Sequence, residues 1–307
     1  MNLVDLHVHS NKSDGSLTPA QLVALAVQKR LSAFALTDHD TTEGIAEARE
    51  AALMHNRLLA EGSLSTDPSS QPLLPLEVIP GIEFSTEYHG KDIHILGLYI
   101  HEQSELFQKQ IHAFIDSRIE RNRKMCANLQ TAGIEISYEQ LLETFPCAVI
   151  TRSHYARFLL DHGYVKSLPE AFDRYLGDHS KYFVPREKVT PVQAVELILQ
   201  VGGIPILAHP PLYHMGDAAL ETLVSSLKEA GLIGIEAIYS TYTPAQERQM
   251  RAIAKKYELE LSGGSDFHGD NKPGLEMGKG YGRLAIPASI LDQLQTHLSP
   301  TQTSCCH

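Results

Sequence analysis

Histidine and carboxylate side chains recur in short clusters along this chain, and their types suit the binding of metal ions. His7 and His9 stand two apart, and in extended backbone such side chains point to the same side, so both imidazoles can reach one ion. The chain has 16 His but only four Cys and no Cys-x-x-Cys, so imidazole and carboxylate are the expected ligands. The other candidates are Asp14, His39, Glu83, His94, His209, Asp266 and His268.

These nine side chains exceed the capacity of one ion, and they predict two or three divalent ions bridged by carboxylates. Imidazole with carboxylate favours Mn²⁺, with Zn²⁺ or Fe²⁺ as alternatives, because Mg²⁺ takes fewer imidazoles. Such ions activate water for attack on an ester, so no covalent intermediate is expected. An isolated His-x-His would indicate only two exposed histidines, and the metal interpretation therefore depends on the whole set.

Short apolar runs alternate with helical patterns at both ends of the chain, which is typical of a parallel α/β fold. Thr18, Thr190 and Thr243 each precede a proline and predict helix starts, with further starts near Thr42 and Ala218. The strand ends of such a fold meet on one face, where the candidate ligands would converge, in a barrel or in an open sheet. The expected strands cover residues 3–6, 33–36, 77–82, 93–99, 204–208, 233–237 and 259–261.

The alternation stops between about His101 and Arg186, where only helical patterns occur. A long charged helix is expected over residues 105–132, followed by shorter helices over 138–144, 153–162 and 169–176. An insert placed after a strand end covers the active-site face of an α/β fold. The expected division is a first barrel part over 1–100, a helical insert over 101–187, a second barrel part over 188–298 and a tail over 299–307. Residues 61–75 are expected to form a surface loop.

The composition excludes several classes of protein. With 43% hydrophobic and 21% charged residues among 307, the chain is expected to fold around a sizeable core. The formal net charge of -11 argues against binding to duplex DNA or an anionic membrane, although short single strands can still enter a groove. A signal-like N-terminus and a long apolar run are both missing, so a cytoplasmic protein is expected. The sequence indicates no obligate protein partner.

Taken together, the motifs resemble those of the PHP (polymerase and histidinol phosphatase) superfamily. The resemblance spans Asp5 to His268 and rests on Asp-Leu-His-Val-His-Ser, Ser-Asp-Gly, Leu-Thr-Asp-His-Asp, Gly-Ile-Glu-Phe-Ser, Ala-His-Pro and Gly-Ser-Asp-Phe-His. It implies a distorted (β/α)7 barrel with phosphoesterase activity at a multinuclear metal centre. It also implies that the nine side chains named above are the metal ligands.

The insert carries Thr-Arg-Ser-His-Tyr-Ala-Arg from Thr151 to Arg157, and this resembles the branch of 3',5'-nucleotide bisphosphate phosphatases. The resemblance implies removal of the 3'-phosphate from a nucleoside 3',5'-bisphosphate to leave the 5'-monophosphate. For some members it implies 5' to 3' exoribonuclease activity on short 5'-phosphorylated RNA. Two alternatives stay open: a phosphatase for a small metabolite such as histidinol phosphate, and a metal or nucleotide sensor without catalysis.

An acidic protein needs a local cation to hold a phosphate, and the planar guanidinium of Arg152 suits this role, with a surface ion pair as the alternative. Ser153 and His154 are expected to add hydrogen bonds to substrate, and Tyr155 to stack on a base. Asp14 and His39 complete the expected substrate contacts.

The expected catalytic residues are His39, His209 and His154, and we expect His209 or His154 to protonate the departing ribose oxygen. Glu236, at a strand end, is expected to orient a ligand. Lys272 either approaches a phosphate or stays a surface charge.

Other polar residues are expected to have no direct part in the chemistry. Arg121, Arg123 and Lys124 are expected to form a solvated face of the long helix. His214 is expected to lie behind the ligands and to contact one of them. The remaining histidines are expected to be surface or structural residues: His55, His89, His101, His112, His162, His179, His297 and His307.

Overall fold

A computed structural model describes residues 2–63, 73–146, 148–177, 179–184 and 189–299. The predicted surface loop over 61–75 and the predicted tail over 299–307 fall mostly outside the described residues. In the described part, eight strands form one sheet in the order β7-β6-β5-β4-β3-β2-β1-β8. Their bounds are β1 Leu3–Val8, β2 Leu31–Leu36, β3 Glu77–Tyr88, β4 Lys91–Leu98, β5 Ile204–Leu207, β6 Gly234–Tyr239, β7 Glu260–Gly264 and β8 Ile286–Pro287.

The sheet curls until strands β1 and β7 meet. Backbone hydrogen bonds of 2.9 Å join the amide of His9 to the carbonyl of Phe267 and the amide of Asp266 to the carbonyl of His7. The short β8 pairs with β1 from outside this ring. The predicted seven-stranded α/β barrel is therefore confirmed, and the metal-ligand motifs of β1 and β7 become neighbours although they lie at opposite ends of the chain.

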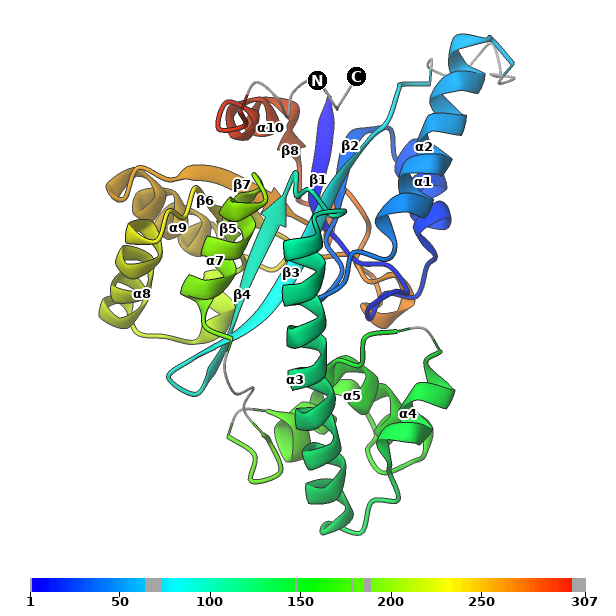
Figure 1. Ribbon diagram of the computed structural model, residues 1–307, viewed down its shortest axis with the longest axis vertical. Coiled ribbons are helices and arrows are strands. Elements are labelled where there is room, and N and C mark those ends of the chain that lie inside the picture. The colour runs from blue at the N-terminus through cyan, green and yellow to red at the C-terminus, as the bar shows by residue number, and fades with distance from the viewer. Residues whose placement is uncertain (1, 64–72, 147, 178, 185–188, 300–307) are drawn as a thin grey trace.

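Outer helices cover the barrel, and the predicted Thr-Pro starts are confirmed. Thr18, Thr190 and Thr243 each accept a hydrogen bond from the backbone of a glutamine three residues on, and that glutamine side chain accepts from the threonine backbone. Apolar faces of these helices pack on the sheet (Figure 1). The outer helices are α1 Pro19–Gln28, α2 Ile45–Ala60, α7 Pro191–Gln200, α8 Asp217–Glu229, α9 Pro244–Lys256 and α10 Ala288–Gln295.

The direction of β4 differs from the prediction. The chain turns at His89 and Gly90, and β4 runs antiparallel to both β3 and β5. The prediction that Glu83 ends a strand is wrong, because β3 continues to Tyr88. His94 lies in the first half of β4 and pairs with Ser85. Because β4 is reversed, its first half reaches the same end of the barrel as the last residues of the parallel strands.

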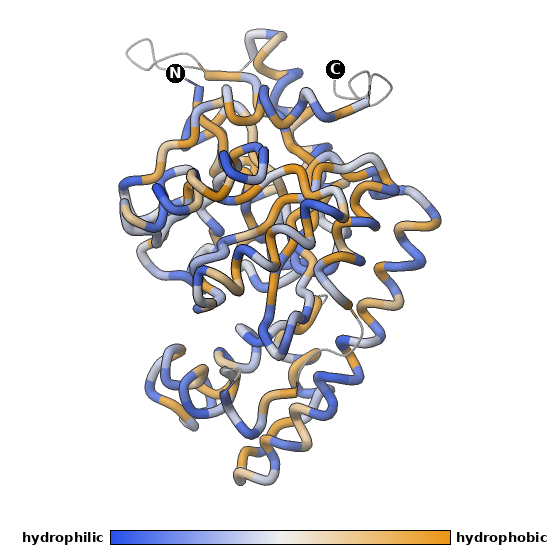
Figure 2. The backbone as a smooth tube through the Cα atoms, turned by 90° about the vertical axis from the view of Figure 1, so that its left-hand side faces the viewer, coloured by the Kyte–Doolittle hydropathy of each residue, from blue (hydrophilic) through white to orange (hydrophobic). Residues whose placement is uncertain are grey.

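The insert is helical as predicted and has an apolar core of its own. The long helix α3 (Glu105–Gln130) contributes Phe107 and Ile111 to the barrel core and Met125 and Leu129 to the insert core. This continuity explains how α3 runs from the barrel into the insert (Figures 1 and 2). The other insert elements are α4 Tyr138–Thr144, α5 Arg152–Asp161, α6 Leu168–Ala171 and a π-helical turn over Phe172–Leu176. The division at residues 101 and 187 stays a prediction.

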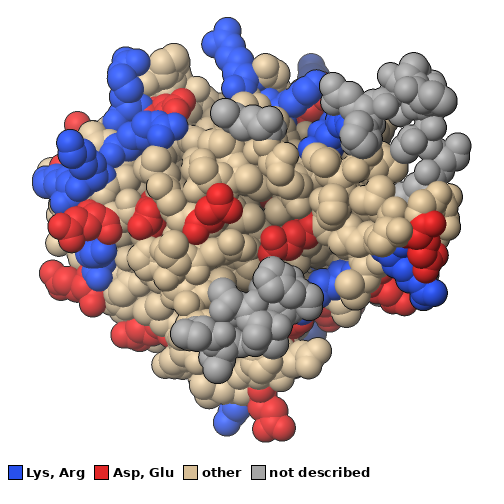
Figure 3. Space-filling model, turned by 90° about the horizontal axis from the view of Figure 1, so that it is seen from above, with Lys and Arg blue, Asp and Glu red and all other residues tan. Residues whose placement is uncertain are grey.

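The barrel end opposite the insert carries α10 and the start of β1, and acidic and basic side chains are interspersed on it (Figure 3). Among the described helices, none combines the length and the apolar character that crossing a membrane requires.

Candidate active site

Glu83 lies at the centre of the candidate metal site, surrounded by imidazoles. Its Oε2 lies 3.2 Å from nitrogens of His7, His9 and His39. Its Oε1 lies 2.8 Å from His94 Nδ1 and 3.0 Å from His209 Nε2. Burial opposes the ionisation of Glu83, but the nearby His39, His7 and His94 hold its pKa well below the usual value. Glu83 is thus an ionised carboxylate that faces five histidines.

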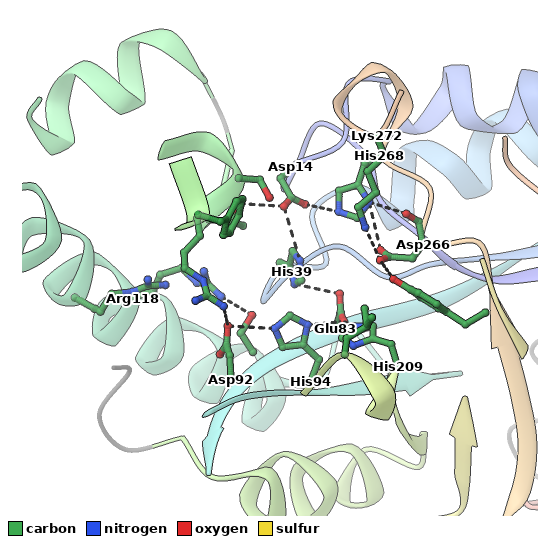
Figure 4. Close-up of a pocket in the computed structure, with 18 residues that line it drawn as sticks. Asp14, His39, Glu83, Asp92, His94, Arg118, His209, Asp266, His268 and Lys272 are labelled. Atoms are coloured by element: carbon green, nitrogen blue, oxygen red, sulfur yellow. Dashed lines mark hydrogen bonds and ion pairs between the residues drawn. The ribbon is translucent and has the colours of Figure 1, made fainter. Parts of the chain in front are cut away.

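All nine predicted ligands come together in four overlapping groups, and within each group the donor atoms lie within 4.8 Å of one another. Figure 4 labels Asp14, His39, Glu83, His94, His209, Asp266 and His268 among them. These groups are His9, Asp14, His39 and His268; His7, Glu83 and His209; His7, His9 and Asp266; and His39, Glu83 and His94.

Several of these donor atoms are buried without a hydrogen-bond partner, namely His7 Nε2, His9 Nε2, Asp14 Oδ1 and His39 Nδ1. Orphaned buried polar atoms are costly, and a bound cation satisfies them. Burial lowers the pKa of His39 to about 3, whereas at His9 and His94 the surrounding carboxylates outweigh burial and raise the pKa to about 9 and about 10. A bound cation would displace the protons from these imidazoles. The residues therefore fit a multinuclear site for divalent metal ions.

Buried side chains behind the ligands fix their orientation. Glu236 Oε1 lies 3.0 Å from His7 Nδ1, and Glu236 Oε2 accepts a 2.8 Å hydrogen bond from the backbone amide of His209. The prediction that Glu236 orients a ligand is confirmed. The second carboxylate oxygen of Asp266 accepts hydrogen bonds from Tyr239 and Lys272.

Two further carboxylates in the ligand motifs, those of Asp5 and Asp38, accept hydrogen bonds from neighbouring loops and are not candidate metal ligands. Asp38 accepts hydrogen bonds from the backbone and hydroxyl of Ser10 and from Ser13. Asp5 accepts from the backbone and hydroxyl of Ser265. These roles could not be predicted from the sequence, because an acid close to a histidine has the same pattern whether it binds a metal ion or anchors the backbone.

A cavity of about 230 Å³ opens over the ligands and is closed on one side by the insert. Arg152 and Ser153 line it, as predicted, and Arg152 donates a 2.8 Å hydrogen bond to Asp92 of β4. Thr151 Oγ1 donates to Asp14 Oδ2 at 3.0 Å, so the start of α5 touches the ligand cluster directly. The insert thus forms part of the site, which agrees with its predicted covering role.

The sequence predicts that Arg121 lies on a solvated face, and this prediction is wrong. Arg121 lines this cavity together with Arg118. Arg118 pairs with Asp40 and donates to Ser85 at 2.8 Å. Arg121 is only 8% exposed, and no carboxylate of the described chain lies within ion-pair distance of it. Burial and then the charge of Arg118 lower the pKa of Arg121 to about 9. Three guanidinium groups therefore face the space above the ligands.

The prediction for Tyr155 is wrong. Its side chain is fully buried in the insert core, and its hydroxyl donates a 2.8 Å hydrogen bond to the carbonyl of Asn122. It does not line the cavity and has no face free to stack on a base. Its helical spacing with Phe158 and Leu159 is the sequence signal that indicates a core position.

The predicted proton donation by His154 is also not supported. His154 Nδ1 accepts a 2.9 Å hydrogen bond from the backbone amide of Thr151. Burial lowers the pKa of His154 to about 4, so the imidazole is neutral near pH 7. His154 caps α5 and borders a separate, mostly apolar compartment of about 300 Å³.

The PHP domain family model matches residues 5–191 of the chain, and the chain belongs to this family. A 5'-3' exoribonuclease, Rnm, of Escherichia coli (strain K12) is 33% identical over 302 residues, 98% of this chain and 96% of the relative. A 3',5'-nucleoside bisphosphate phosphatase of Chromobacterium violaceum is 31% identical over 276 residues, 90% of each chain. The solved structure of an amidohydrolase from Chromobacterium violaceum, with bound sulfate, is similar with a TM-score of 0.80 at 30% identity, covering 96% of this chain and 97% of that one. This protein is a PHP-family hydrolase of phosphate esters.

Proposed function

We propose that the protein removes the 3'-phosphate from nucleoside 3',5'-bisphosphates, and that it cleaves the same P–O3' bond in short 5'-phosphorylated RNA. The observation that carries this proposal is the buried, unpaired guanidinium of Arg121 in the cavity above the metal ligands. A buried charge without a counter-ion is costly. Arg121 Nη1 donates to Met125 Sδ, and Asp92 attracts the guanidinium from beyond ion-pair distance. A substrate with two phosphates would place one at the metal ligands and the other at this guanidinium. The relatives that act on RNA and on nucleoside bisphosphates agree with such a substrate.

Two or three divalent ions, Mn²⁺ first among them, are the proposed cofactors. When bound, such ions activate water and offset charge on the phosphoryl oxygens. The proposed division follows the overlapping ligand groups, with His9, Asp14, His39 and His268 in one part of the site. His7, Glu83, His94, His209 and Asp266 form the other part.

The other proposed roles belong to side chains of this chain. Arg152 and Ser153 line the cavity beside the ligands and orient the substrate phosphates. Arg121 binds the phosphate that is not cleaved. His209 remains the proposed proton donor to the departing ribose oxygen, a role it would have when it does not hold an ion. It lies at the cavity wall, whereas Nδ1 of His154 already accepts a hydrogen bond from the backbone amide of Thr151. Asp14 and His39, which also line the cavity, complete the proposed substrate contacts.

Replacement of Arg121 tests the proposal. Arg121→Met should lower kcat/KM for adenosine 3',5'-bisphosphate by about 10- to 100-fold, the effect of one lost charge-assisted hydrogen bond. The same variant should change kcat/KM for adenosine 3'-monophosphate by no more than about twofold. Arg123→Met, an exposed position on the same helix, is the matched control. Equal losses on both substrates, or none on either, would exclude Arg121 as the second phosphate site.

A further inference from the structure

A second cavity, of about 720 Å³, continues from the active-site pocket. The two cavities share a boundary made by Asp92, His94, Arg152, Phe172, His209 and Leu212. Beyond this boundary the walls come from three separate elements: the β3–β4 turn with His89 and Lys91, the loop after β5 with His214, and the insert with His179. We call this cavity the side groove. It is larger than the space over the metal ligands and lies between barrel and insert.

The outer residues of the side groove take no part in the roles assigned so far. His89, His179 and His214 are exposed, and Leu212 is 41% exposed. Lys91 donates a 3.0 Å hydrogen bond from Nζ to the carbonyl of Tyr213, which holds this cation at the wall. In a chain of net charge -11, the groove has a fixed lysine, three imidazoles and Arg152, which pairs with Asp92 of the same groove. The groove offers a local path for an anion. Its exposed leucine adds apolar surface for a base.

The chemistry of the two proposed substrates differs only in what the scissile phosphate carries. In both, water attacks phosphorus, the P–O3' bond breaks, and the departing O3' takes a proton. The bisphosphate yields inorganic phosphate and a 5'-monophosphate. RNA yields a 5'-monophosphate and a strand that keeps the phosphate on its new 5' end. An RNA substrate therefore needs room beside the metal ligands for the continuing strand, and a bisphosphate does not.

We propose that the side groove binds the RNA strand on the 3' side of the scissile phosphate, an inference that rests on the proposed function. The groove begins at His94 and His209, on one side of the ligand cluster. The other compartment beside the cluster begins at Asp14 and His268, holds only about 300 Å³ and has mostly apolar surface. Its two cations are already paired, Arg157 with Asp161 and Lys272 with Asp266. Phosphates of a strand need the polar groove and not the apolar compartment. Single-stranded RNA binds where cations follow the backbone and apolar or aromatic groups face the bases.

A pair of substitutions at His89 and His214 tests this inference. Both residues have left-handed backbone, with φ of 51° and 49°, which Asp and Asn tolerate better than most residues. The double variant His89→Asp with His214→Asp places negative charge in the groove, and His89→Asn with His214→Asn is the matched neutral control. Rates are measured on a short 5'-phosphorylated RNA and on adenosine 3',5'-bisphosphate. Binding of a labelled RNA to metal-stripped protein is measured separately.

The Asp variant should lower kcat/KM for RNA by about tenfold or more and weaken RNA binding, while kcat/KM for the bisphosphate stays within about twofold. The Asn variant should have a clearly smaller effect on RNA. Equal losses on both substrates, no loss on RNA, or wild-type protein that hydrolyses only the bisphosphate would overturn the side-groove inference and leave the phosphatase in place. If the wild-type protein hydrolyses neither substrate, the proposed function is overturned. The RNA-binding measurement would then still test whether the side groove binds RNA.

Discussion

The guanidinium of Arg152 donates a 2.8 Å hydrogen bond to the carboxylate of Asp92. This contact joins helix α5 of the insert to strand β4 of the barrel. The same carboxylate lies 3.4 Å from Nε2 of His94, a candidate metal ligand. Burial opposes the ionisation of Asp92, but Arg152 and then His94 hold its pKa well below the usual value. Asp92 therefore holds Arg152 of the insert at the cavity wall and at the same time contacts the candidate ligand His94.

Arg152→Ala should raise KM for adenosine 3',5'-bisphosphate by about 10- to 100-fold and leave kcat nearly unchanged, because a charge-assisted phosphate contact is lost. Steady-state kinetics measure this, with Arg174→Ala, an exposed arginine of the insert, as the control. In the single variant Asp92 loses the guanidinium of Arg152. The double variant Arg152→Ala with Asp92→Asn removes this carboxylate charge as well and so separates its effect from the loss of the arginine. An unchanged KM in both variants would make Arg152 only a link between α5 and β4.

Gly264 has no room for a side chain, because a Cβ there would lie 2.1 Å from Cβ of His7. Gly264→Ala should displace His7 and weaken metal binding by about 10- to 100-fold, the usual effect of disturbing a ligand's support. Metal content after dialysis against a graded series of Mn²⁺ measures this. Gly216→Ala, where no atom lies within 4 Å of the added Cβ, is the control. Equal metal content in the two variants would contradict the assignment of His7 as a ligand.

Tyr155→Leu should lower the free energy of unfolding by about 2–3 kcal/mol, because it removes a buried hydrogen bond and part of a packed ring. KM for the bisphosphate should stay the same at temperatures where the variant is folded. Urea denaturation and kinetics on the same preparation measure the two quantities. A raised KM at wild-type stability would restore Tyr155 as a base contact.

The candidate metal site could be predicted from the sequence because short motifs at strand ends carry most of it. His7, His39, His209 and His268 follow apolar runs, and a barrel brings such positions together. The direction of β4 could not be predicted, because an apolar strand between a turn and a helix has the same pattern in either direction. Glu83 and His94 nevertheless reach the site, since the β3–β4 hairpin brings the middle of one strand beside the start of the other.

The burial of Arg121 differs from the prediction for a related reason, whereas Arg123 and Lys124 are exposed as predicted. Arg118 and Arg121 are spaced with Met125 and Leu129 along the buried face of α3. This spacing continues the apolar stripe, and it is the signal that could have shown the arginines turning inward. A charged residue on an otherwise charged helix is usually solvated. The prediction for Arg121 followed this general rule for charged residues and not the position of Arg121 on the apolar face. Burial of Tyr155 has a similar signal, because Tyr155 is spaced with Phe158 and Leu159 along the buried face of α5.

Metal dependence of phosphate release from adenosine 3',5'-bisphosphate tests the central claim most directly. The protein is stripped of metal, Mn²⁺ is added back, and products are identified, with histidinol phosphate as a second substrate and Asp266→Asn as the ligand variant. We expect release of the 3'-phosphate and adenosine 5'-monophosphate only after Mn²⁺ is restored, with little turnover by Asp266→Asn or of histidinol phosphate. Full activity of the stripped protein, or turnover of histidinol phosphate alone, would contradict the account.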